Sequence, residues 1–279
     1  MINYNHYNFT EETMKKVLAI IFVLAICAVT VFGFAACTDK DTLKIGVTVF
    51  KPMNYYIEGT SEWTGFETEF ARAAAEIMGY KNVEFVEIIW ENKVTELQSG
   101  NIDLVWNAMT IKDDLKENMD ISIPYMHNNQ VAVIRKSDAA KYTSLASMSA
   151  AKLGAEANSA GESAIKATNE LKNAPYTAMQ AQSNVLIELM SGTIDVGFID
   201  LTMASASIGE GTSYADLTMI DNNGAYLMIG DDEQYGVGAK KGDPIINELN
   251  EAIRTMYNKG TLQQIAEKYG LLDALMEIK

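Results

Sequence analysis

Few side chains in the region after residue 41 could act as catalysts. His127 is the only histidine there, and the two cysteines, Cys27 and Cys37, both lie upstream. No serine stands in a Gly-x-Ser-x-Gly context, zinc-ligand spacing is absent, and Gly209-Glu210-Gly211 lacks the rest of a dinucleotide fingerprint. We interpret His127 as a loop or hinge residue, and we expect no enzymatic activity, no catalytic residue, no metal and no cofactor.

Polar side chains instead follow two apolar runs that are candidates for buried strands. Leu104-Val105-Trp106 is followed by Asn107-Ala108-Met109-Thr110, and Val196-Gly197-Phe198-Ile199 is followed by Asp200. A carboxylate in that place is costly to bury without a partner. A ligand ammonium group would be a suitable partner for Asp200. The alternative is that Asp200 caps a helix that starts at Leu201, a position that suits aspartate.

Strand-like and helix-like patterns alternate along the chain and would position these groups. Residues 43–49 alternate apolar and polar side chains, which predicts a strand. Apolar residues recur at helical spacing over 66–77, and Gly79 follows as a stop signal. The same reasoning predicts a strand over 83–88, a helix over 92–99 and a strand over 102–105. Such alternation predicts parallel sheets covered by helices on both faces.

An internal echo predicts two units of like construction. The phrase ELQSGNID at residues 96–103 reappears as ELMSGTID at residues 188–195. Each copy reads as a helix end, a glycine cap and a buried strand, and the copies are about 90 residues apart, too far for a solenoid repeat. We therefore expect two α/β units, with a cleft for a small solute beyond the carboxyl ends of their strands.

The N-terminal residues predict an exported protein. Lys15 and Lys16 precede an apolar run over 17–34, which is followed by Ala35-Ala36-Cys37 and polar residues. This ending resembles the lipobox of bacterial lipoproteins, although Phe34 stands where leucine is usual. We expect a signal peptide over residues 1–36, with residues 1–13 an upstream mis-start, and lipid attachment at Cys37. The alternative is one uncleaved membrane-spanning helix.

Composition narrows the classes of ligand. The net charge of −15 argues against nucleic acid and anionic lipid surfaces as ligands, and we interpret the acidity as a contribution to solubility. With no cysteine after Cys37, the exported part holds no disulfide. Its length of about 240 residues is enough for one or two hydrophobic cores.

A set of short phrases recurs in a fixed order over most of the chain. The phrases are LKIGV at 43–47, GFETEFA at 65–71, LQSGNID at 97–103, MTI at 109–111, DISIPY at 120–125, GTID at 192–195 with Asp200, YGVG at 235–238 and NKGTL at 258–262. Together they resemble the family 3 extracellular solute-binding proteins of polar amino-acid ABC transporters, from Leu43 to about Gly270.

The resemblance implies a fold and a role. The fold is α/β and two-lobed, like periplasmic binding proteins, with an open, mostly parallel sheet flanked by helices in each lobe and a two-strand hinge. Residues 42–128 and 229–279 would form one lobe, and residues 129–228 the other. The role implied is that of a monomeric lipoprotein on the extracytoplasmic face of the cell membrane. It would capture an amino acid, an amine or a related small polar solute by lobe closure and deliver it to an ABC permease and its ATPase.

Six ligand-binding positions follow from the resemblance. Phe50 and Trp90 match aromatic residues that sandwich the ligand side chain, and the alternative is that both rings are ordinary core. Asp200 matches the acid that pairs with the α-ammonium group. The segment that holds the polar head of the ligand is matched by Asn107, Ala108 and Thr110, with a simple turn as the alternative for Thr110.

Two usual holders of the α-carboxylate are altered. Leu115 stands where the family has an arginine, and the Gly-Ser-Thr turn reads Asn158-Ser159-Ala160. Three interpretations remain open. Lys112 or another nearby cation replaces the arginine, the amides of Asn158 and Ser159 suffice, or the ligand lacks an α-carboxylate and is an amine or a peptide-like compound.

Two other functions stay open on this fold. One is a periplasmic enzyme, such as a dehydratase of aromatic amino-acid precursors. The other is a sensory lipoprotein that passes a ligand signal to a receptor.

Overall fold

The structure is a computed structural model that describes residues 40–222 and 224–279. The predicted signal peptide over residues 1–36 and the lipid site at Cys37 lie outside the described residues. Residues 41–279 form one compact unit. No helix within the described ranges is both long and apolar enough to cross a membrane.

Three parallel strands and the helices between them form the first group of elements. Strands β1 (Thr42–Val47), β4 (Asn82–Glu87) and β5 (Leu104–Thr110) lie in the order β4-β1-β5. Helix α2 (Phe66–Ile77) connects β1 to β4, and α3 (Lys93–Ser99) connects β4 to β5. We call this group the first half.

A second group repeats this pattern later in the chain. Strands β8 (Leu153–Glu156), β9 (Tyr176–Met179) and β10 (Val196–Asp200) are parallel, in the order β10-β8-β9. Helix α5 (Ala160–Ala167) follows β8, α6 (Gln182–Ser191) follows β9, and α7 (Leu201–Ser207) follows β10. We call this group the second half.

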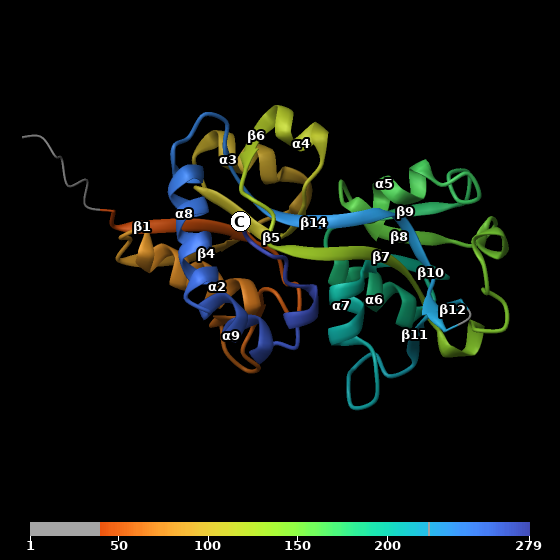
Figure 1. The fold of residues 1–279 in the computed structure, drawn as a ribbon. Helices are drawn as coiled ribbons and strands as arrows, with labels where there is room; N and C mark the ends of the chain where they lie inside the picture. The colour runs from red at the N-terminus through yellow and green to blue at the C-terminus, as the bar shows by residue number, and fades with distance from the viewer. Residues whose placement is uncertain (1–39, 223) are drawn as a thin grey trace, which may run out of the picture. The chain divides into compact units, whose positions relative to one another are not determined.

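Two long strands join the halves. Strand β7 (Met126–Arg135) pairs with β10, strand β14 (Met228–Lys240) pairs with β5, and the two pair with each other, all antiparallel. The result is one sheet in the order β4-β1-β5-β14-β7-β10-β8-β9. Figure 1 shows β7 and β14 running side by side between the two groups of strands.

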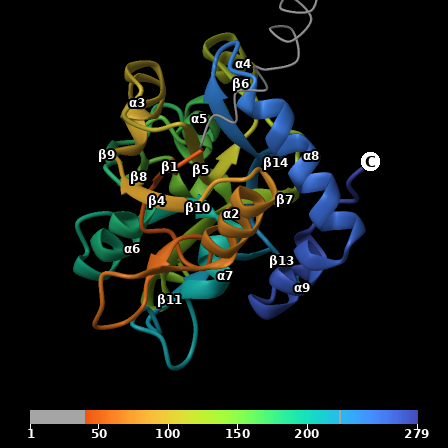
Figure 2. The ribbon, with the colours of Figure 1, turned by 90° about the vertical axis from the view of Figure 1, so that its left-hand side faces the viewer.

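The remaining elements are short or lie at the edges. They are β2 (Tyr55–Tyr56), β3 (Trp63–Thr64), η1 (Trp90–Asn92), α4 (Asp113–Asn118), β6 (Met119–Ile121), η2 (Lys136–Asp138), η3 (Leu145–Met148), β11 (Leu217–Met219), β12 (Asp221–Asn222), β13 (Ala225–Tyr226), α8 (Ile245–Asn258), α9 (Thr261–Lys268) and η4 (Leu272–Ala274). Helices α8 and α9 pack against α2, so the end of the chain completes the first half (Figure 2).

The predicted junctions of the internal echo are present in both halves. Helices α3 and α6 each end at a glycine in the left-handed conformation, Gly100 at φ 77° and Gly192 at φ 79°. A side chain at either position would strain the backbone, which is why glycine serves there. The strands that follow, β5 and β10, are the two that carry the predicted polar groups.

One expected boundary is wrong. Asn107, Ala108 and Thr110 were expected beyond the end of a strand over 102–105, but β5 runs from Leu104 to Thr110 and contains them. The strand continues because β14, which is distant in sequence, pairs with it as far as Thr110, opposite Tyr235. Thr110 is therefore a strand residue rather than a turn residue.

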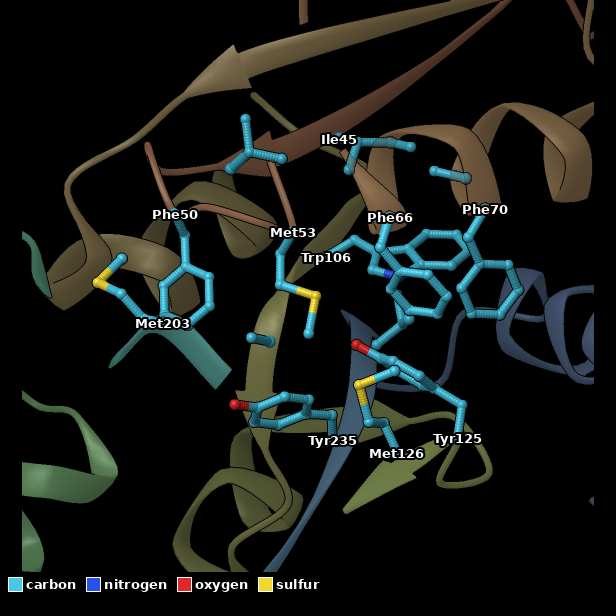
Figure 3. Packing of buried hydrophobic residues seen from close by; sticks show 14 of the residues in the cluster. Ile45, Phe50, Met53, Phe66, Phe70, Trp106, Tyr125, Met126, Met203 and Tyr235 are labelled. Carbon is cyan, nitrogen blue, oxygen red and sulfur yellow. The ribbon is translucent and has the colours of Figure 1, made fainter. Parts of the chain in front are cut away.

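The hydrophobic core extends through both halves. One cluster of buried side chains joins β1, α2, β5, α6, α8 and α9, and two smaller clusters lie under α5 and α3. Figure 3 shows aromatic members of the large cluster, including Phe66, Phe70, Trp106 and Tyr125. Phe70 meets Trp106 edge to face at 4.8 Å between ring centroids, a favourable aromatic geometry.

Candidate functional site

A small cavity lies between the ends of β5 and β10. All eight residues predicted to bind ligand line it: Phe50, Trp90, Asn107, Ala108, Thr110, Asn158, Ser159 and Asp200. The other lining residues are Lys93, Met109, Lys112, Leu115, Glu156, Ala160 and Gln182. The volume of the cavity, about 20 Å³, leaves room for about one water molecule, so the walls must separate before a small solute can enter.

Asp200 is held by the two strands that join the halves. It is the last residue of β10 and stands at the N-cap position of α7, but its side chain makes no capping hydrogen bond. Gln130 of β7 donates to its Oδ1, and the Tyr235 hydroxyl of β14 donates to its Oδ2 at 2.7 Å. Burial raises the pKa of Asp200, and the negative charge of Glu233 acts in the same direction. The carboxylate therefore still lacks a cation.

A second carboxylate, Glu156, lines the cavity at the end of β8. The residue is 4 % exposed, and its Oε1 has no hydrogen-bond partner. Burial raises the pKa of Glu156 well above the ordinary value, and the charge of Asp200 adds to that effect. A backbone hydrogen bond from Gln182 and the charge of Lys93 act against it.

Lys93 is the buried cation of the cavity wall. Its ammonium donates to the carbonyls of Trp90 and Asn158, each at 3.3 Å, and lies 4.5 Å from the centroid of the Trp90 ring. Burial lowers the pKa of Lys93 to about 8. A positive charge over an aromatic face is favourable, so Trp90 partly compensates for the lost water.

The two aromatic residues belong both to the core and to the cavity. Phe50 is 2 % exposed and lies in the large core cluster, and Trp90 is 6 % exposed and lies in the cluster under α3. Figure 3 shows Met203 of α7 beside Phe50. The predicted cavity position and the core alternative thus hold together, because each ring packs on one side and lines the cavity on the other.

The side chain of Asn107 is engaged within the protein. Its Oδ1 accepts from the Thr48 backbone at 2.9 Å and from Asn54, and its Nδ2 donates to the Thr48 hydroxyl at 2.7 Å. These bonds join the end of β1 to β5. In this arrangement the side chain of Asn107 shapes the wall, and its amide is not free to bind a solute.

Ala108 is fixed from behind by a buried glutamate. Its backbone amide donates to both carboxylate oxygens of Glu67, at 2.8 and 3.0 Å, and Ala108 has a φ of 48°. Asn54 and Tyr125 also donate to this carboxylate. Burial raises the pKa of Glu67 to about 7 despite these three donors. The amide of Ala108 is therefore not available to a ligand.

Gly65 places Glu67 in that position. A Cβ on Gly65 would lie 2.1 Å from the Met53 carbonyl oxygen, and the φ of 129° is one that glycine adopts readily. Because the backbone can approach so closely, Phe66 and Glu67 donate to the carbonyls of Pro52 and Met53 at 2.9 and 3.0 Å. The start of α2 is thus fixed beneath the cavity floor.

Thr110, which lines the cavity, is hydrogen-bonded to Glu233. The Thr110 hydroxyl donates to Glu233 at 3.1 Å, and Asn128 and Gln130 donate to the same oxygen. Gln130 Nε2 also donates to Asp200, so Asp200 and Glu233 share one donor. Thr110 therefore contributes to the network that surrounds Asp200.

The turn between β8 and α5 forms the opposite wall. Ser159 caps α5 by accepting from the Glu162 amide at 3.2 Å, and Asn158 adopts a φ of 55°. The Asn158 amide donates to Glu162 at 2.8 Å, and the Ser159 amide donates to the Glu156 carbonyl at 3.3 Å. Both amides are already paired, so neither is free to hold a carboxylate in this conformation.

Cations rather than these amides are placed to receive a ligand carboxylate. Leu115, in the position of the missing arginine, packs in the cluster under α3. Lys112 lines the cavity, donates to Ser163 at 3.3 Å and lies 3.8 Å from Asp114. Of the three interpretations of the altered site, substitution by a nearby cation agrees best with this geometry, with Lys112 and Lys93 as the two candidates.

Hydrogen bonds cross directly between the walls. Lys93 of the first half donates to the Asn158 carbonyl of the second half, and Asn158 Nδ2 donates to Glu91 at 3.3 Å. Lys112 and Ser163 form a third contact of this kind. The cavity is therefore closed over by contacts between the halves.

Three lining residues were not predicted from the sequence: Lys93, Glu156 and Gln182. A signal for Glu156 was present. Lys44-Ile45-Gly46 in β1 corresponds to Lys152-Leu153-Gly154 at the start of β8, so the echo extends to the first strands and points to the residue two places after each glycine. For Lys93 no such signal exists, because its partner Asn158 is distant in the chain.

Comparison with known proteins identifies relatives along most of the chain. Residues 43–272 match the model of the bacterial extracellular solute-binding proteins, family 3. The L-cystine-binding protein TcyJ of Escherichia coli (strain K12) is 24% identical over 232 residues, which are 83% of this chain and 83% of that protein.

Solved structures agree with the fold. An ABC uptake transporter substrate binding protein from Streptococcus pneumoniae with bound histidine has a TM-score of 0.74 and 30% identity, covering 85% of this chain and 95% of that one. An ancestral amino acid-binding protein, named as a precursor of cyclohexadienyl dehydratase, has a TM-score of 0.69 and 27% identity, covering 82% and 95%. These likenesses confirm the predicted fold class and the predicted resemblance. The chain belongs to the bacterial extracellular solute-binding proteins of family 3.

Proposed function

We propose that this chain is the substrate-binding component of an ABC importer and captures an amino acid in the cavity between its halves. The observation that carries the proposal is that aromatic rings, carboxylates and ammonium groups from both halves meet around one small cavity. The family and the named ligands of its relatives support the same function.

The charges of the walls give the ligand an orientation. Asp200 receives the α-ammonium group, because its carboxylate is buried and has only neutral donors. Lys93 and Lys112 receive the α-carboxylate. They take the role of the family's arginine, whose position is occupied by Leu115 in this chain. The side chain of the ligand extends between Phe50 and Trp90.

Capture proceeds by closure of two lobes about a hinge. We assign residues 42–128 and 229–279 to one lobe and residues 129–228 to the other, with β7 and β14 as the hinge strands. A solute that contacts both walls stabilises the closed state over the open one, and this difference in affinity drives closure. The cross-wall bonds of Asn158 add to the closed state.

The cellular setting follows from the N-terminal residues. We propose that the signal peptide over residues 1–36 directs export and that Cys37 carries the lipid that anchors a monomeric protein to the outer face of the membrane. The closed form then docks on an ABC permease whose ATPase drives uptake. Relatives of this chain are named as binding proteins, and we assign no enzymatic role.

A ligand screen tests this function. The purified protein is unfolded in denaturant to release any bound solute and is then refolded by dialysis. Its melting temperature is measured with each L-amino acid, with amines and with short peptides. A ligand at a hundred times its dissociation constant adds about 2.7 kcal/mol of stability. We expect at least one amino acid to raise the melting temperature, and we expect the protein not to convert that amino acid into a product. Stabilisation by no amino acid, or conversion of an aromatic amino-acid precursor, would overturn the proposal.

A further inference from the structure

We infer that the ligand is a basic amino acid, whose side-chain cation pairs with Glu156 while its α-ammonium group pairs with Asp200. The inference rests on the proposed function, because it names the class of amino acid that the same cavity binds. It assigns a specificity role to Glu156, which lies in the second half at the end of β8.

One carboxylate oxygen of Glu156 is buried and accepts no hydrogen bond from the protein. Its side chain lines the cavity, the residue is 4 % exposed, and Oε1 accepts no hydrogen bond. A buried carboxylate without a partner is strongly unfavourable, and a bound cation is the partner that removes this cost. Because Glu156 lines the cavity and its Oε1 is unpaired, a solute that enters the cavity can supply that cation.

Lys93 does not donate a hydrogen bond to Glu156 Oε1. The ammonium of Lys93 directs its hydrogen bonds to the carbonyls of Trp90 and Asn158 rather than to Glu156. Its charge attracts Glu156 only at longer range. Lys93 therefore reduces the cost of the buried carboxylate but leaves Oε1 unpaired.

The pairing of charges around the cavity points to a ligand with a second cation. Two carboxylates, Glu156 and Asp200, and two ammonium groups, those of Lys93 and Lys112, line the cavity. In the proposed orientation the α-carboxylate of the ligand meets the lysines and its α-ammonium group meets Asp200. Glu156 then remains for a cation on the ligand side chain.

Matched ligands test the inference on the wild-type protein. Titration calorimetry compares L-lysine with L-norleucine, which lacks the side-chain ammonium, and L-arginine with L-citrulline, which has the same shape without the charge. L-Glutamine, cadaverine and agmatine complete the set. We expect one of the two basic amino acids to bind on the order of a hundredfold more tightly than its neutral counterpart, as for a buried ion pair.

Two variants locate the effect. In Glu156→Gln, the preference for the basic amino acid over its neutral counterpart should fall by at least tenfold. In Glu170→Gln, which removes the same charge from an exposed position of the same half, the preference should not change. If Glu156→Gln did not fold, the ligand comparison on the wild type would still decide the matter.

The outcomes separate this inference from the proposed function. If L-norleucine, L-citrulline or L-glutamine bound as tightly as the better of the two basic amino acids, the role of Glu156 would be overturned and an amino-acid binder would remain. Tighter binding of cadaverine or agmatine than of L-lysine and L-arginine would overturn the inference too. These two amines lack the α-carboxylate of an amino acid. Binding of no amino acid at all would overturn the proposed function itself.

Discussion

The two halves are built alike where their strands begin and differ where those strands end. In each half an aspartate after the glycine cap accepts from a lysine amide of the first strand. Asp103 accepts from Lys44 at 2.8 Å, and Asp195 accepts from Lys152 at 3.0 Å. One sequence phrase therefore builds the same junction twice.

Close packing next to these junctions is also repeated. A Cβ on Gly46 would lie 2.5 Å from Ile102 Cδ1, and a Cβ on Gly154 would lie 2.6 Å from Ile194 Cδ1. Two places further on, the likeness ends: Thr48 follows Gly46, and Glu156 follows Gly154. Thr48 is paired with Asn107 through both its amide and its hydroxyl, whereas Glu156 retains an unpaired oxygen.

This difference shows how one framework serves two purposes. In the first half the buried carboxylate, Glu67, has three protein donors and holds the wall in place. In the second half the carboxylates Glu156 and Asp200 line the cavity, and neither forms an ion pair within the described residues. We therefore expect substitutions in the first half to reduce stability and substitutions in the second half to change binding.

The largest effect is expected for Glu67→Ala. It leaves the amide of Ala108, Asn54 and Tyr125 without their shared acceptor, all of them buried. We expect the free energy of unfolding to fall by about 3–5 kcal/mol, because three buried donors lose their acceptor and each unsatisfied group costs about 1–3 kcal/mol. Urea denaturation followed by circular dichroism measures the change. A loss under about 1 kcal/mol would contradict the structural role.

Next in size is Asp200→Asn, which removes the charge that pairs with the ligand ammonium. Loss of one partner of a buried charge pair costs about 2–5 kcal/mol of binding, which corresponds to at least about thirtyfold in affinity. Calorimetry with the amino acid found in the ligand screen measures it. Glu170→Gln is the comparison variant, because it removes a carboxylate from an exposed position outside the cavity.

The pH dependence of binding is the third test. Burial raises the pKa of Asp200 and of Glu156, so acidification protonates them while an ordinary carboxyl group near pKa 4 stays ionised. Only the ionised form attracts an ammonium group. We therefore expect affinity to fall by roughly tenfold or more between about pH 8 and pH 5.5. A flat profile over this range would show that neither carboxylate titrates in it.

Glu67 should give the ligand-free protein the opposite trend. Its pKa in the folded state is about 7, above the ordinary value of 4.5, so the folded protein binds the proton more tightly. Its contribution to stability is present at acid pH and is lost as the pH rises from about 4.5 to about 7. Comparison of wild type with Glu67→Gln across this range isolates the contribution.

A smaller effect of opposite sign is expected for the stability of Glu156→Gln. Replacement of an unpaired buried carboxylate by a neutral amide reduces the cost of burial, so the ligand-free protein should gain about 1 kcal/mol. The measurement is again urea denaturation, without ligand. If this variant lost as much stability as Glu67→Ala, the contrast between the two halves would be wrong.

The smallest effect is expected for Glu91→Ala. It removes the exposed hydrogen bond to Asn158 Nδ2 across the cavity but leaves the Asn158 carbonyl bound to Lys93. Exposed contacts of this kind contribute about 0.5 kcal/mol, so affinity should fall by less than about threefold. A tenfold loss would mean that this contact governs closure.

The sequence allowed the strands and helices of residues 43–105, the repeated junction near residues 188–199 and eight positions of the cavity wall to be predicted, but not how their atoms would be engaged. Phe50 and Asp200 stand next to strong apolar patterns, so their places could be predicted from neighbours in the chain. The pairing of Asn107 with Thr48, and of the Ala108 amide with Glu67, depends on residues that only the fold brings together. The reach of β5 to Thr110 was missed for the same reason, since its partner is Tyr235.

The position of β14 late in the chain affects the order in which the sheet can form. Strand β5 pairs with β1 on one side and with β14 on the other, and β14 spans Met228–Lys240. On a ribosome the free edge of β5, which ends at Thr110, therefore stays unpaired until synthesis has passed Met228. Unpaired strand edges promote aggregation. A chaperone that shields the emerging polypeptide before export would protect this edge in particular.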